Sequence, residues 1–244
     1  MYKLLISIVS HGQLDLVNDL LSDLEACNLE RCIIVVRSNK SEATKISTQN
    51  LDCIHVKNLR PAGFSYNHNR NFEMVKSEYF AILNPDLKII DPQIFQKLID
   101  MAEKYNTDLV CPSVVDSDGN LEDNARKFPR ILEVCKRLCS VKYRKNMHSS
   151  NKEIETVDWC AGMFHLYPSA LFKNLKGLNE KYFLYCEDVE IGLRLKRRGF
   201  TTSICRDVFV EHDARRESHR KMKFLSYHLV SYIRLYFYLY LKIS

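Results

Sequence analysis

The sequence is poor in the two residues that most often interrupt regular structure, with only 7 glycines and 6 prolines among 244 residues. It contains no internal repeat and no low-complexity tract, which excludes a repeat or low-complexity protein. Hydrophobic residues make up 46% of the chain and charged residues 27%, as in a soluble globular protein. We therefore expect one compact domain with a sizeable core.

Signals for disulfides, zinc and secretion are also lacking. The nine cysteines are odd in number and include no Cys-x-x-Cys pair, which favours reduced thiols in a cytosolic protein. The apolar run Tyr2–Val9 is short, has no small-residue cleavage site after it, and is followed directly by His11 and Asp15. We interpret this run as a first buried strand.

The net charge of +6 is concentrated near the end of the chain, where Arg194–Lys223 has ten Lys/Arg against four Asp/Glu. A basic region of this kind suits nucleotide phosphates or anionic lipid. The alternative is a solvated basic face. Because no nucleic-acid-binding motif is present, we expect no nucleic-acid partner.

The first hundred residues alternate the patterns of strands and helices. The expected strands are Tyr2–Ser10, Ile33–Val36, Cys53–Val56 and Tyr79–Leu83. The expected helices cover Leu14–Leu24, Asn69–Lys76 and a segment that begins near Pro92. This alternation predicts a mostly parallel sheet with ligand sites at the carboxyl ends of its strands.

The pattern is less regular after Val110. Asp116–Gly119 predicts a turn, and the basic segment Cys135–Lys152 predicts a mobile loop near the mouth of the site. The later expected elements are a short helix near Pro168–Lys173, a charged helix from Glu187 to Gly199, a last strand at Thr202–Val210 and a tyrosine-rich helical tail from Lys221.

Asp86 lies just past the end of an expected buried strand, where Pro85 forces the chain to turn. A carboxylate held in this way can bind a hard divalent cation that bridges two phosphates. An aspartate in a turn after proline is also a common structural feature. His212, at the end of the last expected strand, is a second candidate ligand for the same ion.

Three acids occur within four positions at Glu187, Asp188 and Glu190. Acids in the first turn of a helix complement its dipole, and Glu190 can pair with Arg194 four residues later. This structural interpretation explains Glu190 well but explains Glu187 and Asp188 only generically.

In this order, the motifs resemble those of the family-2 glycosyltransferases of the GT-A fold, over most of the chain. Leu83–Asp86 resembles that family's Asp-x-Asp metal motif. Gly177–Phe183 and Glu187–Arg194 resemble its Gly-Phe-Asp-Glu and Glu-Asp-x-Asp-Leu-x-x-Arg signature. Asn58, Gly63-Phe64 and Asn69 resemble its Asn…Gly-Phe…Asn segment beside the nucleotide.

Three further segments, Val9–Gly12, Arg126–Pro129 and Val157–Gly162, are most similar to the O-antigen rhamnosyltransferases. Those enzymes transfer L-rhamnose from dTDP-rhamnose to N-acetylglucosaminyl-diphosphoundecaprenol. The resemblance therefore implies a nucleotide-diphosphate sugar donor and a polyprenyl-diphosphate-linked acceptor. The alternatives are transfer of another sugar from a UDP donor, and a non-catalytic membrane-bound scaffold of the same fold.

The resemblance also implies a fold and a division of the chain. The fold is α/β, a single Rossmann-like GT-A domain with a mostly parallel central sheet and a C-terminal helical tail. The domain covers residues 1–220, with a nucleotide-binding half at 1–110 and an acceptor and catalytic half at 111–220. Residues 221–244 form an amphipathic, membrane-associating tail.

Roles for individual residues follow from the same resemblance. Asp188 is the general base of an inverting transfer, Glu187 supports it, and Asp86 and His212 hold Mg²⁺ or Mn²⁺. Trp159 and Gly162 contact the acceptor. The residues expected around the nucleotide sugar are Ser10, His11, Ser38, Asn39, Asn58, Gly63, Asn69 and Asn84.

Two departures from the family pattern affect these expectations. Arg37-Ser38-Asn39 stands where many relatives have Asp-Asn, which puts base and ribose recognition at Ser38 in doubt. Asn84 replaces the first aspartate of the metal motif, which leaves one carboxylate and predicts weaker metal binding.

The tail from Lys221 to Ser244 is interrupted by His228 and Arg234, so we do not expect it to span a membrane. Its tyrosines and phenylalanines suit the bilayer interface, and the preceding basic residues suit anionic headgroups. We therefore expect a peripheral protein on the cytoplasmic face of the bacterial inner membrane. The alternative is a helix that packs on the domain or forms a homodimer.

Overall fold

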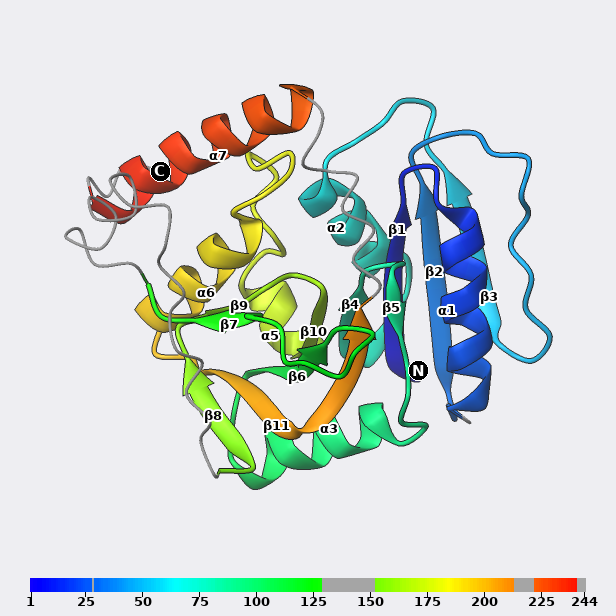
Figure 1. Ribbon diagram of the computed structural model, residues 1–244, viewed down its shortest axis with the longest axis horizontal. Helices are drawn as coiled ribbons and strands as arrows, with labels where there is room; N and C mark the ends of the chain where they lie inside the picture. Colours follow the sequence, from blue (N-terminus) through cyan, green and yellow to red (C-terminus); the bar gives the residue numbers. More distant parts are fainter. Residues whose placement is uncertain (28, 129–151, 213–221, 241–244) are drawn as a thin grey trace.

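The computed structural model describes residues 1–27, 29–128, 152–212 and 222–240, which form a mixed sheet with helices on both faces (Figure 1). The strands are β1 (Tyr2–Ser10), β2 (Cys32–Ser38), β3 (Asp52–Lys57), β4 (Ser77–Leu83), β5 (Leu87–Lys88), β6 (Leu109–Val115), β7 (Ala125–Arg126), β8 (Ile154–Val157), β9 (Trp159–Cys160), β10 (Phe164–Pro168) and β11 (Thr202–His212). The helices are α1 (Leu14–Ala26), α2 (Phe64–Met74), α3 (Ile94–Lys104), α5 (Ser169–Asn174), α6 (Glu187–Arg197) and α7 (Met222–Tyr240).

The sheet has a parallel part and a mixed part. Strands β3, β2, β1 and β4 lie side by side and are all parallel. Next to β4, strand β10 runs antiparallel and separates it from the parallel pair β6 and β11. The four strands expected in the first hundred residues are confirmed, whereas neither β6 nor the antiparallel insertion of β10 was predicted from the sequence.

The sheet separates two hydrophobic cores because alternate residues of its strands point to opposite faces. On β1, Leu4, Ile6 and Ile8 pack in the core under α1 and α3. Leu5 packs in the other core, with residues of α5 and α6. Burial on both faces explains why β1 reads as one apolar run.

Helix α2 begins at Phe64, five residues before the predicted start at Asn69. Its buried side chains are mainly polar: Ser65, Asn67, His68, Asn69 and Asn71. Hydrophobic periodicity could not mark this helix, because the face it turns to the protein carries hydrogen-bonding groups instead of apolar ones.

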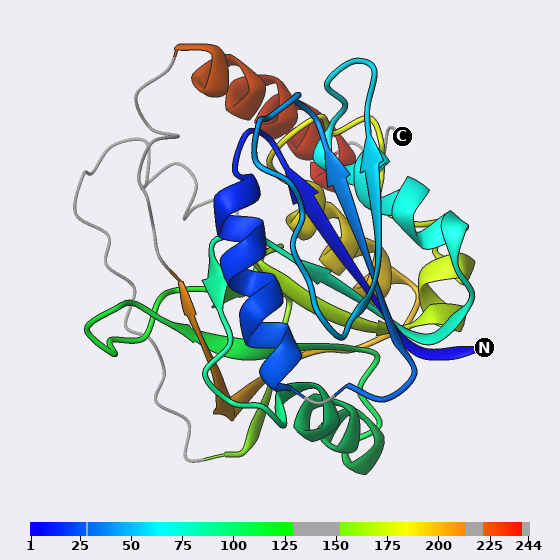
Figure 2. The same cartoon turned by 90° about the vertical axis from the view of Figure 1, so that its right-hand side faces the viewer.

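The C-terminal helix predicted from Lys221 is confirmed as α7. In Figures 1 and 2 it lies on the side of the molecule where β1, β2 and β3 end, and α3 lies on the opposite side. Across the described residues, no helix combines the length and hydropathy needed to cross a bilayer. The predicted loop Cys135–Lys152 lies outside the described residues except for Lys152.

Candidate active site

Asp86 follows β4 at the sheet edge where β10 begins. Because β10 is antiparallel to β4, residues just before Phe164 lie next to residues just after Leu83. The Asn84 N–H donates to the Met163 carbonyl at 2.8 Å. The turn that carries Asp86 is thereby fixed to the segment that contains Gly162.

His212 reaches Asp86 because the last residue of β11 pairs with Leu87 of β5. Its Nε2 lies 3.3 Å from Asp86 Oδ2, and its Nδ1 lies 3.0 Å from Glu122 Oε2. The hydrogen bond to Asp86, reinforced by the charges of both carboxylates, raises the pKa of His212 to about 9. The imidazole therefore occupies a position that favours a positive charge.

The residues at this position fit a divalent cation that is completed by a substrate. Asp86 Oδ1 is buried without a hydrogen-bond partner, so one carboxylate oxygen has unused capacity. Adjacent ligands of an octahedral ion at about 2.1 Å are about 3 Å apart, close to the 3.3 Å between Asp86 Oδ2 and His212 Nε2. Within the described ranges no three His, Cys, Asp or Glu side chains form a complete metal cage. An ion held here would take its other ligands from phosphate oxygens and water.

Glu187 and Asp188 form a second acidic pair, in the first turn of α6. Asp188 accepts hydrogen bonds from the Val189 N–H at 2.8 Å and the Gly162 N–H at 3.3 Å. Glu187 is buried, and its Oε2 has no partner. Burial raises the pKa of Glu187 to about 8, helped by the neighbouring charge of Asp188. Burial also raises the pKa of Asp188, although its two backbone hydrogen bonds oppose the shift.

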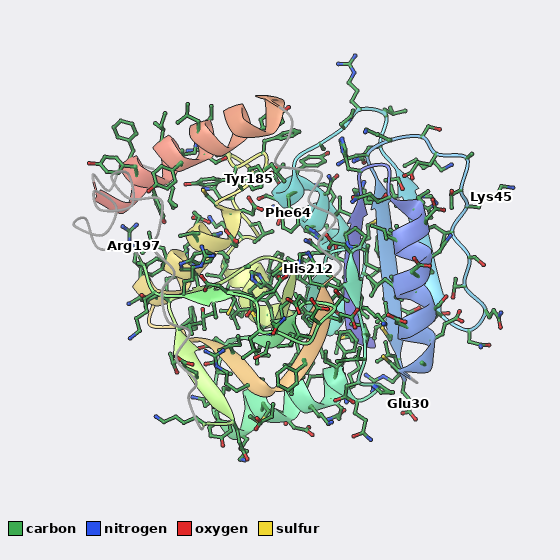
Figure 3. The ribbon with its side chains drawn as sticks, viewed as in Figure 1. Glu30, Lys45, Phe64, Tyr185, Arg197 and His212 are labelled. Carbon is green, nitrogen blue, oxygen red and sulfur yellow. The ribbon has the colours of Figure 1, made fainter. Side chains whose placement is uncertain are left out.

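The two acidic groups lie on either side of one short segment. Gly162 bonds to Asp188, and the next residue, Met163, bonds to the turn that carries Asp86. The amino end of β10 therefore connects the base candidate with the metal candidate. In Figure 3, the labelled Phe64, Tyr185 and His212 lie around the middle of the molecule, at the start of α2, just before α6 and at the end of β11.

The turn before α6 has an unusual backbone. Tyr185 and Cys186 have φ values of +71° and +67°, a conformation that side chains other than glycine rarely adopt. Neighbouring segments hold this turn: the Phe64 N–H donates to the Phe183 carbonyl at 2.8 Å, and Ser231 Oγ of α7 donates to the Leu184 carbonyl at 2.9 Å.

Gly63 allows α2 to approach the same turn. A Cβ atom at this position would lie 2.7 Å from the Phe183 carbonyl oxygen and 2.9 Å from its Cα. Any other residue at position 63 would push the start of α2 away from the turn that carries the acidic pair.

Gly162 lies between the base candidate and an aromatic ring. The nearest atoms to a Cβ added at this position would be Asp188 Cβ and Phe64 Cζ, both at 3.7 Å, which is ordinary contact. A methyl group here would therefore touch both neighbours without a clash.

Trp159 packs against α6 at Gly192, where an added Cβ would lie 2.6 Å from Trp159 Cβ. The Arg126 guanidinium lies 5.5 Å from the centre of the indole ring. Arg126 also lies close enough to Asp188 to act against the rise of its pKa. The indole Nε1 is buried without a partner.

Of the residues expected around the nucleotide, Ser10, His11, Ser38, Asn39 and Asn58 lie at the carboxyl ends of β1, β2 and β3, whereas Gly63 and Asn69 are at the start of α2 and inside it, and Asn84 follows β4. Ser10, Ser38 and Asn58 end or follow these strands, with the Asn39 N–H bonded to the Ser10 carbonyl at 2.8 Å and the Asn58 N–H to the Ser38 carbonyl at 2.9 Å. His11 is exposed directly after β1. Ser38 Oγ is hydrogen-bonded to His55 Nε2 at 2.8 Å.

Asn39 and Asn58 belong to a partly buried network of amides. The Asn58 amide donates to Asn39 Oδ1 at 2.9 Å and to Asn67 Oδ1 at 2.7 Å. Arg37, which replaces the aspartate of many relatives, donates to Asn58 Oδ1 at 3.1 Å and to Asn71 Oδ1 at 2.8 Å. This network fixes the backbone beside the strand ends, and Arg37 stabilises it by two hydrogen bonds.

Asn69 lies apart from the other expected nucleotide residues. Its amide brackets the backbone of Leu178, accepting from the N–H at 2.8 Å and donating to the carbonyl at 2.9 Å. It thereby ties α2 to the segment before the acidic turn, and a Cβ at Gly177 would clash with it.

Two residues next to the acidic groups were missed as candidates from the sequence. Glu122 holds His212 through Nδ1, and Arg126 stands beside Asp188. Both follow β6 in a segment with only short strands, so no periodicity relates them to the distant residues they meet.

Known proteins are similar to this chain in sequence and fold. Residues 17–225 match the model of the glycosyltransferase-like family 2. Rhamnosyltransferase WbbL of Escherichia coli K12 is 30% identical over 80% of this chain and 77% of its own length. The N-acetylglucosaminyl-diphospho-decaprenol L-rhamnosyltransferase of Mycobacterium tuberculosis is 25% identical over 50% of this chain and 43% of its own length. The chain thus spans less than half of the mycobacterial protein.

Solved structures with the same fold include two that contain Mn²⁺. The mannosyltransferase of Pyrobaculum calidifontis, in complex with GDP-Man and Mn²⁺, superposes with a TM-score of 0.64 at 13% identity, over 96% of this chain and 65% of that one. GalNAc-T7 with UDP, GalNAc and Mn²⁺ superposes with a TM-score of 0.63 at 15% identity, over 87% of this chain and 44% of that one. The expected GT-A fold is therefore confirmed, and this chain belongs to glycosyltransferase family 2.

Proposed function

We propose that the protein is an inverting, metal-dependent rhamnosyltransferase that moves L-rhamnose from dTDP-rhamnose to a polyprenyl-diphosphate-linked N-acetylglucosamine. The main support is Asp188, a half-buried carboxylate that accepts from the Gly162 N–H and lies one short segment away from Asp86 and His212. The choice of sugar and acceptor rests on the two related rhamnosyltransferases.

In this proposal, Asp188 accepts the proton of the acceptor hydroxyl as that oxygen attacks the anomeric carbon. Its raised pKa makes it a better proton acceptor than an exposed aspartate. Glu187, whose pKa is raised to about 8, is protonated at neutral pH and keeps a second negative charge away from the base. A single displacement of this kind inverts the anomeric configuration.

Asp86 and His212 would hold Mg²⁺ or Mn²⁺, which neutralises the charge that grows on the leaving diphosphate. Glu122 would orient the imidazole through Nδ1. The nucleotide would lie over the ends of β1, β2 and β3, near Ser10, His11, Ser38 and Asn39. The acceptor would enter beside Trp159 and Gly162.

Transfer can be tested with purified protein, synthetic polyprenyl-diphosphate-linked N-acetylglucosamine and several nucleotide sugars. We expect product only with dTDP-rhamnose and a divalent cation, with the anomeric configuration of the donor inverted in the product. A preference for a UDP-sugar would reject the rhamnose assignment and leave the base assignment intact. Absence of transfer and of donor hydrolysis with every sugar would favour the non-catalytic scaffold.

A lipid-linked acceptor requires the active site to work at a membrane surface. We therefore place the protein at the cytoplasmic face of the bacterial inner membrane, as a peripheral protein. Fractionation of cells that express the tagged full chain tests this location, because a peripheral protein is released from the membrane fraction by alkaline carbonate.

A further inference from the structure

One face of α7 is covered by large hydrophobic side chains that no described residue buries. They recur at helical spacing, so they form one outward stripe. The exposed residues are Leu229 (59%), Val230 (54%), Tyr232 (40%), Ile233 (48%), Tyr236 (46%) and Phe237 (45%). The opposite face of the helix is anchored on the domain by Ser231 and Leu235, which are 3% and 5% exposed.

A basic pocket adjoins the flank of the same helix. It has a volume of about 440 Å³ and lies between α6, α7 and the segment before the acidic turn. Its cationic lining residues are Lys176, Lys181, Arg194, Arg198 and Arg234.

Two carboxylates, Glu180 and Glu190, also line the pocket. Glu190 is neutralised by Arg194 at 2.9 Å, and Glu180 pairs with Arg70 at 3.1 Å. No carboxylate of a described residue forms an ion pair with the other four cations of the lining. The pocket therefore carries a net positive charge.

The stripe of α7 lies on the side of the molecule where β1, β2 and β3 end. Figures 1 and 2 show α7 beyond the ends of β1, β2 and β3, where the nucleotide residues gather. We propose that the stripe of α7 and the adjacent pocket form one docking surface for an anionic lipid bilayer. The stripe enters the interface, and the pocket binds the phosphate of an anionic headgroup.

Charge favours a bilayer over a second copy of the chain. Arg234 stands at the margin of the stripe and lines the pocket. A two-fold dimer through this face would bring the same cations of both copies together, whereas an anionic surface attracts them. The tyrosines and phenylalanine suit the interface between headgroups and acyl chains. The docking is argued from the stripe and the pocket alone; only its purpose, access to a lipid-linked acceptor, rests on the proposed function.

The test is co-sedimentation of the full chain with vesicles of phosphatidylcholine alone or with phosphatidylglycerol added, without substrates. Point variants are preferable to truncation because α7 also holds the turn before α6. We expect Ile233→Ser with Phe237→Ser to lower the partition coefficient on anionic vesicles at least about tenfold. The matched control is Ile90→Ser with Tyr105→Ser, which changes side chains that are 50% and 43% exposed at the two ends of the α3 region.

The pocket is tested by Lys181→Gln with Arg198→Gln. These changes should reduce the preference for phosphatidylglycerol by about fivefold for each cation removed and leave binding to neutral vesicles unchanged. Lys97→Gln with Lys104→Gln on α3 is the charge-matched control. Thermal melting of each variant verifies folding.

Equal partitioning of the stripe variant and wild type would overturn the proposal. So would a concentration-dependent dimer in light scattering that the stripe variant abolishes, because the stripe would then be a protein interface. Vesicle binding is measured without a sugar donor, so a wrong donor assignment cannot change the result. If docking is correct but transfer is not, binding persists in a protein that transfers no rhamnose.

Discussion

The two acidic groups of the site have similar composition and opposite electrostatic character. Asp86 and Glu122 surround an imidazole and stabilise its positive charge, so this group is suited to a cation. Glu187 is buried and the adjacent Asp188 is half-buried; among the described residues neither forms an ion pair, and the pKa of each rises. Acids after a strand and acids at a helix start therefore suit different chemistry: the first group favours a positive charge, and the second favours bound protons.

Asp188→Asn should lower activity more than any other change if Asp188 is the proton acceptor. Loss of a positioned base should lower the transfer rate by ~10²–10⁴-fold, while calorimetry should find donor binding almost unchanged. Asp207→Asn, an exposed position on β11, is the control. Retention of more than a third of the wild-type rate would show that Asp188 is not the base.

Asp86→Ala should remove the contribution of divalent cation to donor affinity, by at least about tenfold, and His212→Ala should reduce it less. Calorimetric titration of donor with and without Mn²⁺ measures this. Asp91→Ala, a nearby aspartate paired with Lys97, should behave as wild type. If donor affinity is identical with and without Mn²⁺ in every variant, Asp86 and His212 do not hold a metal ion.

Glu187→Gln should change the pH dependence of both activity and stability. The pKa of Glu187 is raised in the folded protein from 4.5 to about 8. The protonated side chain therefore contributes stability that is fully present below pH 4.5 and is lost as pH rises through about 8. The melting temperature of the variant should therefore fall less between pH 5 and pH 8 than that of wild type. The alkaline limb of its kcat/KM profile, where wild-type Glu187 loses its proton beside the base, should move to higher pH.

The control for this prediction is Glu30→Gln, at an exposed position. Parallel melting curves for Glu187→Gln and wild type across this range would mean that Glu187 keeps its ordinary titration. The proposed protonated partner of Asp188 would then be wrong.

Gly162→Ala should have the smallest effect. The new methyl group makes only ordinary contacts at 3.7 Å, so the melting temperature should stay within ~1 °C. It fills space beside Asp188, and we expect the KM for acceptor to rise about fivefold while donor affinity is unchanged. Gly192→Ala, whose methyl would clash with Trp159, should instead lower the melting temperature by several degrees. An unchanged acceptor KM in Gly162→Ala would place the acceptor elsewhere.

The parallel part of the fold could be predicted because β1 and β2 are buried on both faces and read as apolar runs, and because helices alternate with the strands. The second half could not be ordered from the sequence. The place of β10 depends on its antiparallel pairing with Leu83, more than eighty residues earlier, and no local pattern encodes that contact. Helix α2 was placed too late because its inward face is built from amides and an imidazole.

Motif order singled out Asp86, Asp188 and His212 as candidates, and the structure brings Asp86 and His212 into contact and links Asp188 to the same edge. It marked Arg126 only as part of the segment Arg126–Pro129 and did not mark Glu122, because each meets its partner through tertiary packing alone. Family signatures also could not distinguish an amide that faces a ligand from one that holds the backbone. The Asn69 side chain is of the second kind, because its amide is hydrogen-bonded to the backbone of Leu178.

The two left-handed residues before α6 have a consequence for the order in which the protein becomes functional. Such a backbone costs about 1–3 kcal/mol at each residue and persists only while its surroundings hold it. One of those contacts comes from Ser231 of α7, a helix that leaves the ribosome after every strand of the sheet. The strands of the sheet can therefore pair before α7 docks, whereas the turn before Asp188 gains its final support only with that step.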